Sequence, residues 1–140
     1  MDAKIKSLCD EIRQVSYDLH HYLGHGHLEK VYENGLCHRL SKAGLSVESQ
    51  VPLDVFDEDG VLLGHYVADL VIEDLIIVEI KAVSRLRDEH CAQLLGYLKA
   101  LKIEHGLLIN FGAYRFEIKK FVFSKKPHIN HLGSLSSFAA

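Results

Sequence analysis

The strand positions of the most β-prone stretch of the sequence, residues 66–81, carry two carboxylates, Asp69 and Glu79, and one lysine, Lys81. Asp69 belongs to the first half of this stretch, and Glu79 and Lys81 belong to a nearly unbroken run of aliphatic residues in its second half. Because side chains alternate along a strand, Glu79 and Lys81 point to the same face. Charged groups on a buried strand cost free energy unless they have a partner, a metal ion or a chemical task.

Whether Asp69 shares this site depends on the turn between the two strands. Directly opposed residues of an antiparallel pair lie on one face, so Asp69 joins Glu79 only if the two residues pair. A two-residue turn at Glu73 and Asp74 shifts the register by one position and separates the carboxylates. We therefore expect a loop of three or five residues around Asp74, or a bulge.

These side chains suit the metal-dependent hydrolysis of a phosphodiester. Asp69 and Glu79, helped by the backbone carbonyl of Ile80, can hold Mg²⁺ or Mn²⁺ and leave positions open for water. Such an ion polarises a phosphate oxygen and lowers the pKa of a bound water. Lys81 lies two residues from Glu79, where it can orient the water and stabilise the negative charge of the transition state.

The elements that position these residues follow from the periodicity of the sequence. Helices are predicted at residues 2–23, 27–43 and 89–102, and strands at residues 47–55, 61–72, 75–83, 107–111 and 114–123. Gly44 is expected to close the second helix, and Asp88 is expected to cap the third. The order of these elements predicts an α/β domain with a mixed central β-sheet flanked by helices.

Two residues of the predicted helices are further candidates for the site. On a helical wheel Glu29 falls among the apolar residues of the second helix, but Arg39 falls within the same arc. The wheel alone leaves open whether Glu29 faces the site or pairs with Arg39 at the border. Gln93 and Tyr97 lie one turn apart on the third helix and could present a polar row to the site, whereas His90 fits a solvated face.

Composition limits the possible function classes. The 140 residues are 48% hydrophobic and carry a formal charge of −3, which predicts one domain, residues 1–126, without an overall basic surface. Residues 127–140 lack a periodic pattern and are predicted to form a mobile tail. Three widely spaced cysteines and the absence of an apolar run of ~20 residues predict a soluble, cytoplasmic protein with no membrane contact.

Several motifs together resemble a known family. Asp69, followed ten residues later by Glu79-Ile80-Lys81, resembles the PD-(D/E)XK nuclease motif. The residues Gly26, Glu29 and Tyr32 match the naming motif of its GxxExxY branch. Further similar segments, in the same order, lie at residues 66–69, 78–83, 92–97 and 106–111, so that the resemblance covers about residues 5–123.

The resemblance implies a restriction-endonuclease-like core and a role for each candidate residue. Asp69 and Glu79 would be metal ligands, Lys81 the catalytic lysine, Glu29 an accessory carboxylate and Gln93 a residue that lines the site. His25 and His27 depart from the pattern around Gly26, which affects the entry to the second helix. The implied function is a metal-dependent nuclease, with DNA favoured over RNA as its substrate.

Two other functions remain open at this stage. Asp69, Glu79 and Lys81 could form a buried ion network in a nuclease-fold protein that has lost activity and serves as a nucleic-acid or protein interaction module. A zinc site from His21, His25 and His27 is the other alternative, although Gly24 and Gly26 interrupt the helix that would pair them. The low basic charge suggests that a partner protein delivers the substrate, and the sequence leaves open whether two copies form a homodimer.

Overall fold

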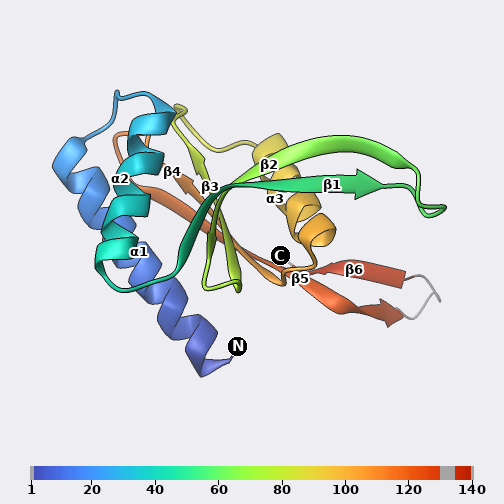
Figure 1. Cartoon of the computed structure of the whole chain (residues 1–140). Coiled ribbons are helices and arrows are strands. Elements are labelled where there is room, and N and C mark those ends of the chain that lie inside the picture. The colour runs from blue at the N-terminus through green and yellow to red at the C-terminus, as the bar shows by residue number, and fades with distance from the viewer. Residues whose placement is uncertain (1, 130–134, 140) are drawn as a thin grey trace.

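The computed structural model describes residues 2–129 and 135–139. It contains three helices and six strands within these residues: α1 (Ala3–Leu23), α2 (Glu29–Lys42), β1 (Val47–Phe56), β2 (Leu62–Ile72), β3 (Ile76–Lys81), α3 (Asp88–Leu101), β4 (His105–Asn110), β5 (Glu117–Ile129) and β6 (Leu135–Ala139) (Figure 1). The strands form one sheet in the order β1-β2-β3-β4-β5-β6. Only the pair β3 and β4 is parallel, and α3 connects these two strands. The predicted α/β domain with a mixed sheet is confirmed.

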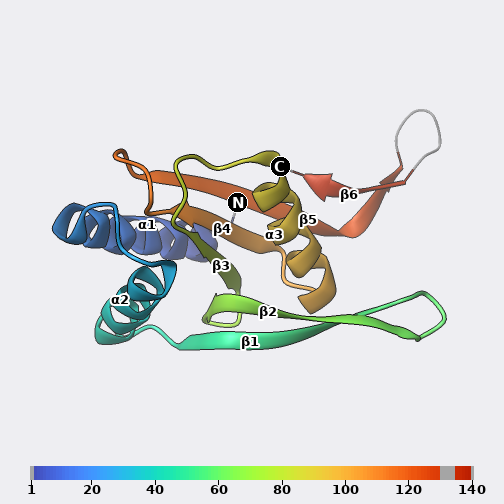
Figure 2. The same ribbon diagram turned by 90° about the horizontal axis from the view of Figure 1, so that it is seen from above.

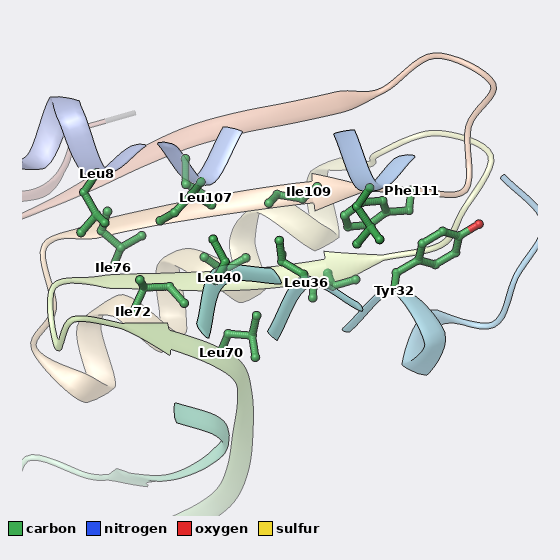
Figure 3. Close-up of a cluster of buried hydrophobic side chains, with 14 residues drawn as sticks. Leu8, Tyr32, Leu36, Leu40, Leu70, Ile72, Ile76, Leu107, Ile109 and Phe111 are labelled. Carbon is green, nitrogen blue, oxygen red and sulfur yellow. The ribbon is translucent and has the colours of Figure 1, made fainter. Parts of the chain in front are cut away.

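Helices α1 and α2 cover one face of the sheet. Their apolar side chains pack against those of the sheet and form the larger of two core clusters. Figure 3 shows Leu36 and Leu40 of α2 over the middle of the sheet, with the Tyr32 hydroxyl at the edge of the cluster. The Tyr32 and Phe111 rings are stacked at 4.8 Å between centroids. The fully enclosed members include Ile12, Tyr32, Leu36, Leu40, Leu70, Ile72, Ile76, Val78, Ile80, Ile109 and Phe111.

Helix α3 covers the opposite face and forms a second core cluster. Its buried residues Leu94 and Leu98 pack with side chains of the sheet such as Val71, Ile77 and Leu108. Figure 2, turned by 90°, shows α3 apart from the pair α1 and α2. The alternation of Ile76, Val78 and Ile80 with Ile77 therefore reflects a strand buried on both faces, as its composition predicts.

The beginning of α3 differs from the expectation that Asp88 caps it. Arg87 is the N-cap residue in extended backbone conformation, and Asp88 is the first helical residue. The ring of His90 accepts a hydrogen bond from the Arg87 N–H at 3.0 Å and in this way caps the start of the helix. His90, for which the sequence favours a solvated face, is half-buried. Asp88 still contributes a favourable charge in the first turn.

Strands β1 and β2 form a long hairpin that leaves the sheet. They pair from Val47↔Ile72 to Phe56↔Leu62, whereas β2 pairs with β3 only from Leu70↔Val78 to Ile72↔Ile76. The far part of the hairpin, residues 51–68, is called the β1–β2 arm below. Figures 1 and 2 show the arm extending past α3 at the side of the molecule remote from α1 and α2.

The predicted tail, residues 127–140, lies partly outside the described residues. Residues 127–129 belong to β5, and residues 135–139 form β6, which pairs with β5. Its mobility stays a prediction, as does the domain boundary at residue 126.

Candidate active site

The candidate site lies where β2 and β3 separate. The pairing of Leu70 with Val78 places Asp69 opposite Glu79 at the next step, beyond which the strands diverge. The turn is the three-residue loop of residues 73–75, with left-handed backbone at Glu73 and Asp74. The predicted odd loop length is confirmed, and it brings the two carboxylates together for the physical reason given by strand parity.

Asp69 and Glu79 connect β2 and β3 at the fork, because the carboxylate of each accepts a hydrogen bond from a backbone N–H of the other strand. The Asp69 carboxylate accepts a bond from the Ile80 N–H at 2.8 Å, and the Glu79 carboxylate accepts one from the Asp69 N–H at 3.4 Å. A strand residue directs its N–H and its carbonyl to the same side. The carbonyl of Ile80 therefore faces the open side of β3, as the two carboxylates do.

Glu79 is a buried carboxyl group without full hydrogen bonding. Its side chain is almost enclosed, the residue being 3% exposed, and its Oε1 atom has no hydrogen-bond partner among the described residues. Burial, hydrogen bonding to Asp69 and the negative charge of Asp69 raise the pKa of Glu79 to about 10, while Lys81 acts in the opposite direction. Glu79 is therefore protonated at neutral pH in the metal-free protein.

This pair of carboxyl groups fits a divalent cation. Two carboxylates so close repel each other when both are ionised, and a cation between them removes that repulsion and gives the orphaned Oε1 a partner. Asp69, Glu79 and the Ile80 carbonyl supply the oxygen ligands that Mg²⁺ and Mn²⁺ prefer. Among the described residues, no group of three or more His, Cys, Asp and Glu side chains is arranged around a common metal position. A site here would thus depend on two carboxylates, a backbone oxygen and water.

Lys81 and Gln93 meet at the same end of the fork. The Lys81 ammonium donates a hydrogen bond to the Gln93 side-chain oxygen at 2.9 Å, which links β3 to α3. Lys81 is half-buried and Gln93 is exposed, so both remain accessible from solvent. Gln93 thereby orients the ammonium beside the two carboxylates.

Glu29 approaches the site from the other side of the sheet. It is the first residue of α2, where a carboxylate is favoured by the helix dipole. Partial burial, with the charges of Asp69 and Glu33, raises its pKa, whereas Lys81 and the Ala82 N–H lower it. Arg39, the alternative partner on the wheel, lies instead over the Tyr22 ring at 5.6 Å. The geometry thus favours the site-facing orientation that the wheel left undecided.

The three residues of the G-x-x-E-x-x-Y pattern act together at the start of α2. Gly26 has a φ of 111°, and the Tyr32 hydroxyl donates to the Gly24 carbonyl at 2.6 Å and accepts from the His27 N–H at 3.1 Å. Tyr32 therefore fixes the loop from which Glu29 enters the helix. His25 and His27 are compatible with this entry, because both rings pack edge-on against tyrosines, Tyr114 and Tyr32 respectively.

Sequence reasoning missed a buried polar link between α2 and β1. Glu33 is 4% exposed and accepts a hydrogen bond from Gln50 at 2.6 Å and a contact from the Lys30 ammonium. Gln50 has a φ of 53° and interrupts β1 opposite Asp69. The available signal was the spacing of four between Glu29 and Glu33, which places both on one side of the helix.

A second missed residue, Asn110, holds the end of β3. Its side chain is fully buried, accepts bonds from the N–H groups of Val83 (3.0 Å) and Gly112 (2.9 Å), and donates to the Val83 carbonyl (2.9 Å) and to Glu117 (2.9 Å). A Cβ atom at Gly112 would lie 2.3 Å from the Val83 backbone, so only glycine permits this close approach. The backbone just after Lys81 is fixed in this way.

The histidines proposed for zinc have other surroundings. His21 stacks on Tyr17, and the rings of His25 and His27 contact tyrosines as described. In the part of the chain that the structure describes, no helix has the length and apolar character needed to cross a membrane.

Comparisons with known proteins concern the family and the fold of the chain. The family model described as PD-(D/E)XK nuclease superfamily matches residues 6–121. A solved structure titled "Crystal structure of SSO0001" is similar with a TM-score of 0.57 and 22% identity over 67% of this chain; the match spans 50% of that chain, about half its length. At this identity the likeness concerns the fold alone. No curated protein matches the chain significantly.

Proposed function

Because the chain belongs to the PD-(D/E)XK nuclease superfamily, we propose that it is a metal-dependent nuclease that hydrolyses phosphodiester bonds. The observation that carries the proposal is the carboxyl pair at the fork of β2 and β3. Asp69 and Glu79 are held together by register, and Glu79 Oε1 lacks a partner among the described residues. A structural ion network would satisfy that oxygen, whereas a cation site leaves it free for a ligand.

In this proposal Asp69, Glu79 and the Ile80 carbonyl hold Mg²⁺ or Mn²⁺. A divalent ion at this position supplies Lewis-acid polarisation of the phosphate and an acidified water. Lys81 orients the attacking water and stabilises the charge that develops on the phosphate oxygens. Gln93 keeps the Lys81 ammonium in place through the bond of 2.9 Å. Glu29, close enough to respond to Lys81 and Asp69, serves as an accessory carboxylate that accepts a proton or holds water.

The finer family assignment belongs to the same proposal. We assign the chain to the GxxExxY branch because Gly26, Glu29 and Tyr32 have distinct, connected tasks at the entry to α2. DNA is favoured as substrate by the resemblance alone. The formal charge of −3 favours delivery of the substrate by a partner protein. The free cysteines Cys9, Cys37 and Cys91 fit a reducing compartment such as the cytoplasm.

The proposal is tested by cleavage of single-stranded, duplex and branched DNA and RNA with Mg²⁺ or Mn²⁺. We expect cutting by the wild type and its loss, by about 10²–10³-fold or more, in Lys81→Ala and Asp69→Ala. Asp57→Ala, in the exposed turn of the β1–β2 arm, is the matched control and should cut like the wild type. Cutting that persists in both site variants would point to a contaminating enzyme and contradict the proposal. Absence of cutting by the wild type on every substrate would favour an interaction module.

A further inference from the structure

A groove of about 880 Å³ lies between α3 and the β1–β2 arm. We call it the arm groove. Its aromatic members are Tyr66 and Phe56, both more than half exposed, and Tyr97, which is largely buried. The Tyr66 and Tyr97 rings are 5.8 Å apart and tilted to each other by 44°, and Tyr66 remains 51% exposed.

Residues with small side chains line the arm groove on the side of α3. Ala92, Gly96 and Ala100 follow one another along one face of α3 and all line the groove. Glycine lowers helix stability relative to alanine, and a Cβ atom at Gly96 would meet nothing within 4 Å. Packing within the protein therefore does not require glycine here, whereas a ligand lying close to the helix backbone would.

The arm groove adjoins the candidate active site at Gln93. Gln93 lines the groove and also binds the Lys81 ammonium. Tyr97 lines it too, and the pKa of its hydroxyl is raised by burial and then by the charges of Glu79 and Asp69. Gln93 therefore marks the point where the groove adjoins the fork of β2 and β3, and a strand bound at the fork has the groove beside it.

The charges of the arm groove suit bases better than a row of phosphates. Lys99 lies on α3 and Lys102 follows its last residue as the C-cap, but Asp54 and Glu89 also line the groove, so its formal charge is balanced. Asp54 is already engaged by His65 at 2.5 Å. Duplex DNA is held mainly through its phosphates, and its stacked bases reach an aromatic ring only after flipping. Unpaired bases stack on exposed aromatic rings without that cost.

We propose that the arm groove binds a single strand of nucleic acid, with one base stacked on Tyr66 and the adjoining phosphodiester at Asp69 and Glu79. This inference rests on the proposed nuclease function and names its substrate class. Phe56 and the low floor at Gly96 receive the next nucleotide, and Lys99 and Lys102 contact phosphates at the groove rim.

The test is the binding of fluorescent single strands and duplexes of equal length, in DNA and in RNA, with EDTA present to prevent cleavage. We expect single strands to bind tighter than duplexes. Tyr66→Ala should weaken single-strand binding by about 5- to 150-fold, the range that stacking on one ring accounts for, and Gly96→Leu should weaken it by filling the groove. The ratio of DNA to RNA affinity then identifies which strand the groove prefers.

Matched variants separate this effect from a general loss of structure. Tyr66→Phe retains the ring and should restore most of the single-strand affinity that Tyr66→Ala loses. Tyr114→Ala removes an 83% exposed tyrosine outside the groove and should also have no effect. Duplex binding as tight as single-strand binding, or unchanged single-strand affinity in both Tyr66→Ala and Gly96→Leu, would overturn the inference, as would failure of the wild type to bind any strand.

Cleavage by the same proteins separates this inference from the proposed function. If the wild type binds single strands through Tyr66 but cuts nothing with Mg²⁺ or Mn²⁺, the groove assignment stands and the nuclease function fails. If cutting depends on Lys81 but the preference for single strands is unchanged in Tyr66→Ala, the nuclease function stands and the groove assignment fails.

Discussion

At the residue scale, the proposed chemistry depends on Glu79, whose surroundings disfavour the ionised form of its carboxyl group. Glu79 is almost fully buried, faces Asp69 and has one oxygen without a partner among the described residues. In the metal-free protein these conditions keep it protonated, and a bound cation would release that proton. Metal binding and protonation at Glu79 are therefore linked and should compete.

This linkage predicts how the stability of the metal-free protein depends on pH. The pKa of Glu79 is about 10 in the folded protein and ordinary, 4.5, in the unfolded chain. Its contribution is therefore fully present below about pH 4.5 and is lost as pH rises toward 10. In EDTA, urea midpoints of unfolding should fall between pH 5 and 9, and Glu79→Gln should flatten that fall. Equal slopes in Glu79→Gln and the wild type would contradict the prediction; the exposed Glu48→Gln is the control.

At the element scale, two local devices fix the backbone around the site. The start of α2 is tied by Tyr32, and the end of β3 is tied by Asn110 and the close approach of Gly112. The first set of contacts holds the start of α2, which carries Glu29, and the second holds the end of β3, which carries Lys81. Both residues are candidates for the site. We therefore expect changes there to affect both stability and cleavage.

Tyr32→Phe removes the hydroxyl and keeps the ring that stacks on Phe111. Two hydrogen bonds, to Gly24 and from His27, are lost, which should destabilise the protein by about 1–3 kcal/mol and lower cleavage by freeing the loop before Glu29. Tyr22→Phe, on a 77% exposed tyrosine, is the matched control. Urea unfolding and the cleavage rate measure the two effects. An unaltered stability in Tyr32→Phe would show that the hydroxyl does not hold the loop.

Gly112→Ala should be more damaging than its size suggests. The added methyl group would lie 2.3 Å from the backbone of Ala82 and Val83, so the end of β3 must shift, at a cost of about 1–3 kcal/mol or more. Gly96→Ala adds the same group to open space within a helix and should instead stabilise the protein by about 0.5–1 kcal/mol. Thermal or urea unfolding of both variants measures this contrast, and a Gly112→Ala protein as stable as the wild type would refute it.

The sequence was sufficient for features that depend on period and parity. The odd turn of residues 73–75 follows from the requirement that Asp69 and Glu79 share a face, and the order of elements follows from apolar periodicity. Glu29 could not be assigned from a wheel, because it is the first residue of α2 and its direction depends on the loop before it. The Glu33–Gln50 link was missed because it joins distant segments through a left-handed residue that no local pattern reveals.

At the scale of the whole molecule, the β1–β2 arm extends from a body that carries the candidate active site. The helices α1 and α2 brace one face of the sheet, and α3 and the arm enclose the groove on the other face (Figures 1 and 2). The pairing of β2 with β3 ends at Leu70, so residues 62–68 of β2 separate from β3. This separation leaves room both for the candidate metal position and for the adjoining groove.

The balanced charge of the groove predicts a weak dependence of binding on salt. Lys99 and Lys102 are the lysines that line it, and each phosphate contact with a single strand changes the slope of log K against log salt by roughly 0.7. Two contacts give a slope of about −1.4. Titrations of a single strand between low and moderate salt in EDTA measure it. A slope of about −5 or steeper would indicate a phosphate-binding surface elsewhere on the protein.

The claim that Asp69 and Glu79 hold a divalent ion is tested most directly by calorimetric titration of the purified protein with Mn²⁺. We predict one site in the wild type, retained in Lys81→Ala and in the control Asp57→Ala, and lost in Asp69→Ala and Glu79→Gln. Retention in Lys81→Ala would separate the metal ligands from the residue that acts on the substrate. A wild type that binds no Mn²⁺, or an Asp69→Ala variant that binds it equally well, would contradict the metal site and with it the proposed chemistry.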